Sequence, residues 1–383
     1  MRRIKVLSVF GTRPDTIKLA PVVNELSKYP HLIDSVTCGT AQHREMMDQV
    51  LSVFGISPDY DLGVMRDDQT LFDIAERGLR GLREVLERER PDVTLVHGDT
   101  STAFVGALAS FYCKVKVGHV EAGLRTNQKY DPFPEEMNRR LVGCLSDLHF
   151  APTSEHLGNL LRENFPRSNI YVTGNTVVDA VLAVAATRTG FVDTQLASID
   201  FTGRRLVLVT AHRRENIGEP LQAICAAVRD VLRDFPDTMA VMPVHPNPRV
   251  QSMVFRELSG VERCYLIDPV SYPDMVGLMQ KCFMVMTDSG GLQEEAPALG
   301  KPVLVLRRTT ERPEGLRAGT LILAGVSREG IRTQAGILLS NTEKYRQMAE
   351  SPNPYGDGQA SRRIVSGILH HFGMVDERPA DFA

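Results

Sequence analysis

Short apolar runs alternate with segments of helical periodicity along the whole chain. In the first part of the chain, the apolar runs have the length and composition of buried strands. These strands are predicted at Ile4 to Phe10, Ser35 to Cys38, Val93 to His97, Val115 to Val120 and Leu148 to Ala151. Helices are predicted between them, at Thr16 to Lys28, Arg44 to Phe54, Leu71 to Arg90, Thr102 to Cys113 and Glu136 to Leu145. Such alternation is typical of a doubly wound parallel sheet, an α/β fold.

The alternation starts again after a short apolar run at Ile170 to Val172. Gly174 and Asn175 make a turn before a new helix, so we place a domain boundary between residues 173 and 174. The sequence predicts two Rossmann-like domains, residues 1–173 and 174–358, with a central cleft at the carboxyl ends of their strands. The strands of the second domain are predicted at Arg205 to Thr210, Met239 to Pro243, Cys264 to Ile267, Phe283 to Thr287, Pro302 to Leu306 and Thr320 to Leu323.

Length and composition agree with a two-domain enzyme. A chain of 383 residues is too long for one compact core. Hydrophobic residues make up 43% and charged residues 24%, and no apolar run is long enough to span a bilayer. The Met-Arg-Arg-Ile-Lys start leads directly into a strand, so we expect no signal peptide, no membrane partner and a cytoplasmic location.

Charge and cysteine content exclude other classes of protein. A net charge of −3, with dispersed Lys and Arg, argues against a nucleic-acid partner. The cysteines show no Cys-x-x-Cys spacing and lie mostly in apolar runs, so we interpret them as reduced core thiols and expect no metal site. They are Cys38, Cys113, Cys144, Cys225, Cys264 and Cys282.

A polar turn and two glycines follow the predicted strand at Phe283 to Thr287. Gly290 and Gly291 let a helix start tightly, and its free N–H groups, its dipole and the Ser289 hydroxyl favour a phosphate or pyrophosphate. Glu295, one turn further on, is placed to accept hydrogen bonds from a sugar hydroxyl pair. This stretch therefore predicts a nucleotide diphosphate site. The alternative is an ordinary strand-to-helix turn capped by Ser289.

Three carboxylates follow neighbouring strands of the first domain. Asp99 and Glu121 come directly after predicted strands, and Glu135 follows in the next loop. Arg13 follows the first strand and Lys18 lies within a helical turn of it. We interpret the carboxylates as a proton-transfer site. The alternatives are a helix N-cap for Asp99 and an exposed salt bridge for Glu121.

The second domain has polar clusters in matching positions. His212, Arg213 and Arg214 follow its first strand, and the two arginines are expected to lower the pKa of His212 and keep the ring neutral. A stiff loop at 243–248 and a basic one at 307–314 occupy similar positions. Surface salt bridges are the alternative for each residue taken alone.

Common catalytic and cofactor motifs are missing from the sequence. There is no Gly-x-Ser-x-Gly elbow, no His-Glu-x-x-His pair, no Walker lysine and no Gly-x-Gly-x-x-Gly at the first helix. We therefore predict no cofactor.

A series of short motifs resembles the non-hydrolysing bacterial UDP-N-acetylglucosamine 2-epimerases. The motifs occur in order, from the first strand to Asn353-Pro354-Tyr355-Gly356-Asp357-Gly358, with little insertion. They are Phe10-Gly11-Thr12-Arg13-Pro14, Thr40-Ala41-Gln42-His43-Arg44-Glu45-Met46, His97-Gly98-Asp99-Thr100, Gly118-His119-Val120-Glu121-Ala122-Gly123-Leu124-Arg125-Thr126, Pro134-Glu135-Glu136, Thr173-Gly174-Asn175-Thr176, Thr287-Asp288-Ser289-Gly290-Gly291 and Thr309-Thr310-Glu311-Arg312-Pro313-Glu314.

The resemblance implies a fold and a reaction. The fold is the glycosyltransferase B type, with a carboxyl-terminal helix (about 359–383) that packs back onto the first domain. The reaction interconverts UDP-N-acetylglucosamine and UDP-N-acetylmannosamine. It removes the C2 proton, expels UDP to leave a bound 2-acetamidoglucal, and adds UDP back with protonation from the other face. The product supplies N-acetylmannosamine for surface polysaccharide.

The resemblance also implies roles for individual residues. Asp99, Glu121 and Glu135 share the proton transfers, and His212 acts with Arg13 on the departing diphosphate. The UDP-binding residues are Arg13, Lys18, Ser289, Gly290, Gly291, Glu295 and Arg312. An effector site for the substrate itself is implied at Gln42, His43 and Glu136, and a homodimer is implied as well.

Three positions depart from the family pattern. Asp15 replaces a Glu, Thr16 replaces an Ala, and Arg308 replaces an Asp near the expected diphosphate. Asp68 also stands about where some members carry an Arg of the effector site. Four alternatives therefore remain beside the epimerase: a retaining glycosyltransferase of the same fold, a hydrolysing epimerase, an epimerase of a related UDP-sugar, and a nucleotide-sugar sensor.

Overall fold

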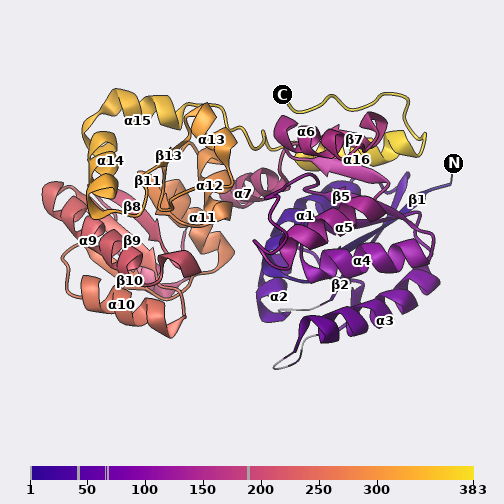
Figure 1. Cartoon of the computed structure of the whole chain (residues 1–383), viewed down its shortest axis with the longest axis horizontal. Helices are drawn as coiled ribbons and strands as arrows, with labels where there is room; N and C mark the ends of the chain where they lie inside the picture. The colour runs from indigo at the N-terminus through magenta and orange to yellow at the C-terminus, as the bar shows by residue number, and fades with distance from the viewer. Residues whose placement is uncertain (1, 41–43, 65, 67–68, 188–189) are drawn as a thin grey trace. The chain divides into compact units, whose positions relative to one another are not determined.

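The computed structural model describes residues 2–40, 44–64, 66, 69–187 and 190–383, without the side chains of 44–46 (Figure 1). The chain forms two compact units. The N-terminal unit consists of Met1–Ala180 and Gly356–Ala383, and the C-terminal unit of Val181–Tyr355.

The N-terminal unit is built on a seven-stranded parallel sheet with the order β3-β2-β1-β4-β5-β6-β7. The chain moves outward in one direction from β1 to β3 and in the other from β4 to β7, so the order reverses between β1 and β4. The strands are β1 Ile4–Phe10, β2 Ile33–Gly39, β3 Tyr60–Asp61, β4 Val93–His97, β5 Lys116–Val120, β6 Leu148–Ala151 and β7 Ile170–Val172.

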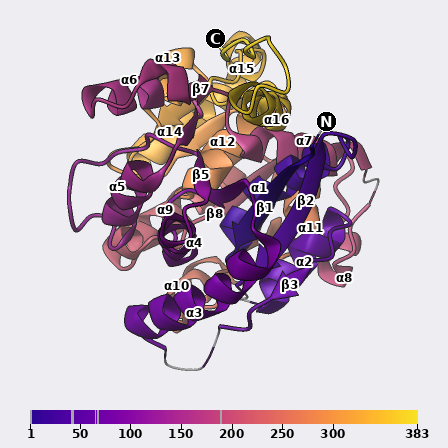
Figure 2. The ribbon, with the colours of Figure 1, turned by 90° about the vertical axis from the view of Figure 1, so that its right-hand side faces the viewer.

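Helices cover this sheet through separate hydrophobic clusters. One cluster joins the sheet to α1, α2 and α16, and another joins it to α3 and α4. Accordingly, α16 and α3 lie on opposite sides of the strands in both views (Figures 1 and 2). The helices are α1 Arg13–Leu26, α2 Arg44–Val53, α3 Leu71–Glu89, α4 Ser101–Tyr112, α5 Glu135–Leu145, α6 Ser154–Arg162, η1 Arg167–Asn169, α7 Thr176–Thr187 and α16 Ala360–His371.

The last residues of the chain lie along the outer strand β7. The Phe382 N–H donates to the Val172 carbonyl at 2.8 Å, and the Val172 N–H donates to the Asp381 carboxylate at 3.1 Å. The Arg378 guanidinium lies 4.3 Å from the centre of the Tyr171 ring. These contacts pair backbone groups of β7 that would otherwise form a bare sheet edge.

The C-terminal unit contains a six-stranded parallel sheet with the order β10-β9-β8-β11-β12-β13, which reverses between β8 and β11. Its strands are β8 Arg205–Thr210, β9 Thr238–Pro243, β10 Cys264–Ile267, β11 Met284–Thr287, β12 Val303–Val305 and β13 Leu321–Leu323. Its helices are α8 Thr194–Ala197, η2 Arg214–Asn216, α9 Glu219–Asp234, α10 Pro248–Leu258, α11 Tyr272–Lys281, α12 Gly290–Ala298, α13 Pro313–Ala318, α14 Arg328–Ser340 and α15 Thr342–Ala349.

The structure confirms the predicted fold class of two doubly wound parallel sheets. The two-residue strand β3 was not predicted, because two residues carry no periodicity. The first helix begins at Arg13 rather than Thr16, since Pro14 is tolerated in the first turn of a helix. The predicted cleft concerns the placement of the two units and stays a prediction.

The division between the units falls inside α7, whereas the sequence predicts a boundary just before this helix. Asp179 in α7 accepts the N–H groups of Ala360 and Ser361, at 3.1 and 2.7 Å. This carboxylate binds the first part of α7 to the start of α16, so both belong to the N-terminal unit.

Two composition-based expectations can be compared with the structure. Among the described residues, no helix has the length and apolarity needed to cross a bilayer. The cysteines are free thiols, but Cys144 is exposed, so the prediction of core thiols is wrong for that residue.

Candidate functional site

The N-terminal unit positions its predicted site residues after three adjacent strands. Arg13 follows β1, Asp99 follows β4 and Glu121 follows β5, and these strands are neighbours in the sheet. Carboxyl ends of parallel strands meet at one edge, next to the reversal of strand order. The turn after β1 needs a glycine, since a Cβ on Gly11 would lie 2.0 Å from the Thr40 hydroxyl.

Glu121 is held by polar side chains from three other elements. One carboxylate oxygen, Oε1, pairs with the Lys18 ammonium and accepts a hydrogen bond from Asn175 Nδ2 at 2.9 Å. The other, Oε2, lies 3.4 Å from His97 Nε2. The Glu121 and Lys18 side chains are only 10% and 12% exposed, so the surface salt bridge considered for Glu121 is wrong. Lys18, predicted to contact UDP, lies against this carboxylate.

Asp99 pairs with an arginine instead of capping a helix. Thr100 is the N-cap of α4 and accepts the Ala103 N–H at 3.1 Å, so the N-cap alternative for Asp99 is wrong. The Asp99 carboxylate accepts hydrogen bonds from the Arg139 guanidinium, through Nε at 3.1 Å and through Nη2. An arginine in α5 thus orients a predicted catalytic carboxylate after β4.

Glu135 and Glu136 begin α5 in different environments. Glu136 is fully buried and accepts hydrogen bonds from the Thr126 N–H at 2.9 Å and from Arg140 Nε at 3.0 Å. Burial opposes its ionisation, but these donors and Arg139 outweigh it and lower the pKa of Glu136. Glu135 Oε2 is buried without a hydrogen-bond partner in the described part of the chain.

The other predicted effector residues, Gln42 and His43, lie outside the described residues, as does Asp68.

Asp15 is a buried carboxylate that was not predicted as a site residue. It accepts hydrogen bonds from the Thr12 N–H at 2.7 Å and the Gly11 N–H at 3.2 Å, and from the Thr100 hydroxyl at 3.3 Å. Burial raises the pKa of Asp15 to about 6 against these donors. The residue fixes the turn that carries Arg13 and links it to the loop of Asp99. An Asp three residues after Thr12, at the start of a helix, was the available signal.

In the C-terminal unit, Asp288 organises the loop after β8. Its Oδ2 accepts hydrogen bonds from the backbone N–H groups of His212 and Arg213, at 2.9 and 2.8 Å, and from Asn216 Nδ2 at 2.9 Å. Its Oδ1 lies 3.7 Å from His212 Nδ1, and the Asp288 side chain is completely buried. Asp288 was not predicted as a site residue, although it directly follows the buried strand β11.

His212 is stacked on a second histidine. The rings of His212 and His245 lie 5.1 Å apart and almost parallel, at 13°. Burial lowers the pKa of His212 most, Asp288 opposes this shift, and His245 and Arg213 add to it. The predicted direction is correct, but its cause is mainly burial, and Arg214 takes no part.

The start of α12 is the predicted anion site, and this assignment stays a prediction. Ser289 is the N-cap residue, as in the alternative of an ordinary strand-to-helix turn, but its hydroxyl makes no capping hydrogen bond. A Cβ on Gly290 would lie 3.4 Å from the Arg312 guanidinium and 3.7 Å from Arg213 Nη2. Neither Gly290 nor Gly291 has a positive φ, so the backbone does not require glycine at these positions. Their lack of a side chain leaves room at the start of the helix.

The two guanidinium groups near Gly290 differ in their partners. Arg312 is held by Glu294, whose Oε1 lies 2.9 Å from Arg312 Nε. Arg213 Nε is buried without a hydrogen-bond partner among the described residues. Arg213 was predicted only to influence the pKa of His212, and its place beside Gly290 was not predicted. Glu295, predicted to bind ribose, is 8% exposed in the second turn of α12, and Arg308 is exposed.

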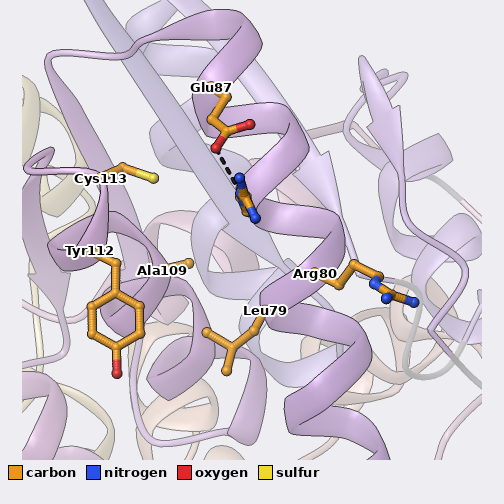
Figure 3. A pocket seen from close by; sticks show the side chains of 7 residues that line it. Leu79, Arg80, Glu87, Ala109, Tyr112 and Cys113 are labelled. Atoms are coloured by element: carbon orange, nitrogen blue, oxygen red, sulfur yellow. Dashed lines mark hydrogen bonds and ion pairs between the residues drawn. The ribbon is translucent and has the colours of Figure 1, made fainter.

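Two surface cavities of the N-terminal unit lie apart from these residues. One, of about 380 Å³, lies between α3 and α4 and contains none of the predicted site residues (Figure 3). Its lining is Leu79, Arg80, Arg83, Glu87, Ala109, Tyr112 and Cys113. Buried acids, bases and cations after strand ends are stronger evidence for chemistry than this hollow. Within the described residues, no group of His, Cys, Asp and Glu could hold a metal ion.

Comparisons with known proteins identify the family of the chain. The sequence model of the family described as UDP-N-acetylglucosamine 2-epimerase matches residues 24–369. The Bacillus subtilis UDP-N-acetylglucosamine 2-epimerase is 50% identical over 382 residues, covering 100% of this chain and 99% of the relative. The crystal structure of the Neisseria meningitidis UDP-GlcNAc 2-epimerase bound to UDP-GlcNAc is 47% identical with a TM-score of 0.88, covering 96% of this chain and 100% of that one.

A more distant structure is similar in fold alone. It is the glycotransferase of kitacinnamycin, 12% identical with a TM-score of 0.65 over 98% of this chain and 100% of that one. The likeness agrees with the glycosyltransferase-type fold that the resemblance implies. Since the family model and a relative at 50% identity both cover most of the chain, the protein belongs to the UDP-N-acetylglucosamine 2-epimerase family.

Proposed function

We propose that the protein interconverts UDP-N-acetylglucosamine and UDP-N-acetylmannosamine by epimerisation at C2, without release of free sugar. The observation that carries the proposal is the buried Glu121 carboxylate, held by Lys18 at the end of a central strand beside the Asp99 loop. A pair of acids and bases in such a place suits proton transfer. Full-length similarity to proteins named as epimerases supports the choice of substrate.

The N-terminal unit would carry out the proton transfers. A base removes the weakly acidic C2 proton while the C1–O bond to UDP breaks, which leaves a bound 2-acetamidoglucal. UDP then adds back to C1 as an acid protonates C2 from the opposite face. We assign these steps to Asp99, Glu121 and Glu135, because two faces of the ring need at least two groups.

The C-terminal unit would bind the nucleotide and stabilise the departing diphosphate. We assign the diphosphate to the start of α12, with Ser289, Gly290 and Gly291 on its oxygens and the guanidinium of Arg312 beside them. Glu295 would accept the ribose hydroxyls. Arg13 and a neutral His212 would complete the set as charge develops on the leaving group.

The test is proton NMR of the purified protein with UDP-N-acetylglucosamine in heavy water. Deuterium at C2 together with UDP-N-acetylmannosamine, and no free sugar, is the expected result. Accumulation of UDP and free N-acetylmannosamine would show a hydrolysing enzyme instead. An unchanged spectrum would overturn the proposal in favour of a related UDP-sugar, a transferase or a sensor, and the Glu121→Gln variant serves as the inactive control.

The remaining expectations stay part of the proposal. Activation by substrate at Gln42, His43 and Glu136 predicts sigmoidal kinetics, and a hyperbolic curve would contradict it. A homodimer predicts twice the mass of one chain in sedimentation equilibrium. A role in surface polysaccharide synthesis follows from the same reaction, and a deletion strain lacking N-acetylmannosamine in its surface polymers would support it. The cytoplasmic location, predicted from the cysteines and the start of the sequence, stays a proposal.

A further inference from the structure

Each oxygen of the Glu121 carboxylate has a neutral polar neighbour. Asn175 donates to Oε1, and His97 Nε2 faces Oε2 at 3.4 Å. Glu121 itself has a φ of 65°, in the left-handed region that a glutamate rarely adopts. A non-glycine residue in this conformation persists only where its surroundings hold it. The surroundings of Glu121 are therefore a candidate for function as well as for stability.

His97 is the neighbour without another evident role. It ends β4, its side chain is 5% exposed, and its Nε2 is buried without a hydrogen bond that meets the usual geometry in the described structure. The 3.4 Å separation is slightly longer than a normal N–H···O bond. Gly98, the next residue, has no side chain, and a Cβ there would approach Glu121 Oε2 to 3.3 Å. The ring and the carboxylate therefore face each other without an intervening side chain.

We propose that His97 is a positioning residue that donates its Nε2–H to Glu121 and thereby holds this carboxylate in its catalytic orientation. The inference rests on the proposed function of Glu121 as an acid or base. It adds a residue that touches neither the sugar nor the nucleotide and acts only through Glu121.

The charges around the ring support a neutral donor. Burial lowers the pKa of His97 to about 4; Glu121 and Asp99 oppose this shift, whereas Lys18 adds to it. His119 of β5 is another titratable group nearby. Its Nε2 forms a hydrogen bond with the Gly98 carbonyl at 2.8 Å. A neutral imidazole has one N–H, and a carboxylate facing Nε2 favours the tautomer with the proton there.

The hydrogen bond from His97 affects catalysis because Glu121 changes its protonation state during the reaction. When Glu121 is ionised, the Nε2–H stabilises the charge and keeps Oε2 from rotating away. When Glu121 takes up a proton, this interaction weakens, so the donor favours return of the proton to the substrate. Loss of the donor should slow turnover more than it weakens substrate binding, since His97 is not expected to touch the substrate.

The test compares His97→Leu with His97→Gln, because the Gln amide nitrogen can occupy the place of Nε2. For His97→Leu we expect kcat to fall roughly 100-fold, the range of one acid–base interaction, with KM changed less than about threefold. The acid limb of its kcat/KM profile should move to higher pH, because an ionised Glu121 is less stabilised. His97→Gln should recover at least about a tenth of the activity.

A matched control is His149→Leu. His149 is also a buried histidine of the same sheet, in β6, with its pKa lowered to about 4 mainly by burial, but it packs on Phe165 with a ring distance of 4.5 Å. This variant should unfold more easily and keep the wild-type pH profile. Equal loss of kcat in both Leu variants, or a wild-type profile in His97→Leu, would overturn the inference.

A second measurement separates this inference from the proposed function. Nitrogen-15 NMR of the wild-type histidines reports the His97 tautomer without any substrate, and we expect the proton on Nε2. A proton on Nδ1 would overturn the positioning role even if the enzyme epimerises its substrate. A wild-type protein that incorporates no deuterium would instead refute the function, and with it the role of Glu121 on which the inference rests.

Discussion

At the scale of single residues, buried carboxylates fix the loops of both units. Asp288 joins three donors after β8, and Asp15 joins the turns after β1 and β4. Neither residue was selected from the sequence, because an Asp after a strand or in a first helical turn is also typical of ordinary capping. Burial and the number of donors distinguish such a carboxylate, and only coordinates supply them.

The first prediction concerns Asp288. Asp288→Ala removes the acceptor for the N–H groups of His212 and Arg213, which would remain unpaired in a partly buried loop. We expect the free energy of unfolding to fall by roughly 3 kcal/mol, within the range for buried donors left unpaired. Urea denaturation followed by circular dichroism measures it. A loss below about 0.5 kcal/mol, the size of an ordinary surface change, would show that water replaces the acceptor.

The second prediction concerns the pH dependence of stability through Asp15. Its pKa of about 6 when folded exceeds the ordinary value of 3.8, so the folded state binds more protons between these values. The contribution of Asp15 is therefore complete below pH 3.8 and is lost as the pH rises through about 6. This shift in the pKa of Asp15 corresponds to a change of roughly 3 kcal/mol in the free energy of unfolding.

Asp15→Asn provides the measurement. The variant loses hydrogen bonds but cannot ionise, so its stability deficit relative to wild type should shrink from pH 4 to pH 7. Urea denaturation at several pH values gives the difference directly. The buried histidines are present in both proteins, so their contributions to the pH dependence of stability cancel in this difference. A deficit that stays constant over this range would contradict the raised pKa.

At the scale of elements, the sequence predicted strands and helices well and their environments less well. Buried parallel strands such as β4 and β8 are mostly apolar, and the polar residues Asp99 and His212 that follow them were recognised by position alone. Local patterns could not predict that Lys18 pairs with Glu121, since these residues are 103 positions apart. The position of Arg213 beside Gly290 could not be predicted for a related reason, because the two residues belong to different strand-helix connections.

The third prediction concerns the start of α12. Gly290→Ala places a methyl group 3.4 Å from the Arg312 guanidinium, in the space assigned to the diphosphate. We expect the Kd for UDP in isothermal titration calorimetry to rise roughly tenfold, equivalent to about 1.4 kcal/mol. Stability should change little, because the backbone conformation suits alanine.

Gly291→Ala is the matched control. Its Cβ would lie 3.6 Å from the Glu295 carboxylate, an ordinary contact distance, and away from both guanidinium groups. A smaller loss of UDP affinity is expected there. Equal losses in the two variants would mean that the helix start as a whole, rather than the space between Gly290 and Arg312, determines binding.

At the scale of the whole molecule, the chain passes twice between the units, in α7 and between residues 355 and 356. Asp179 connects these passages by accepting the N–H groups that begin α16. Burial raises the pKa of Asp179 against these donors. One carboxylate thus anchors both segments to the N-terminal unit.

The fourth prediction follows from this anchor. Asp179→Ala should free the start of α16 and lower the free energy of unfolding of the N-terminal unit by roughly 2 kcal/mol, while the C-terminal unit keeps its stability. Hydrogen exchange read by mass spectrometry resolves the two units. Faster exchange confined to α16 and α7 is the expected pattern, and uniform acceleration over both units would contradict it.

The position of α16 also determines the order in which the molecule can be completed during synthesis. Ile364, Val365 and Ile368 belong to the core beneath β1, although they are translated after the entire C-terminal unit. The N-terminal unit is therefore synthesised first but completes its core last. The apolar sheet face that α16 covers stays exposed on the ribosome while the C-terminal unit folds. A nascent chain stopped at Tyr355 should be bound by chaperones through its N-terminal half.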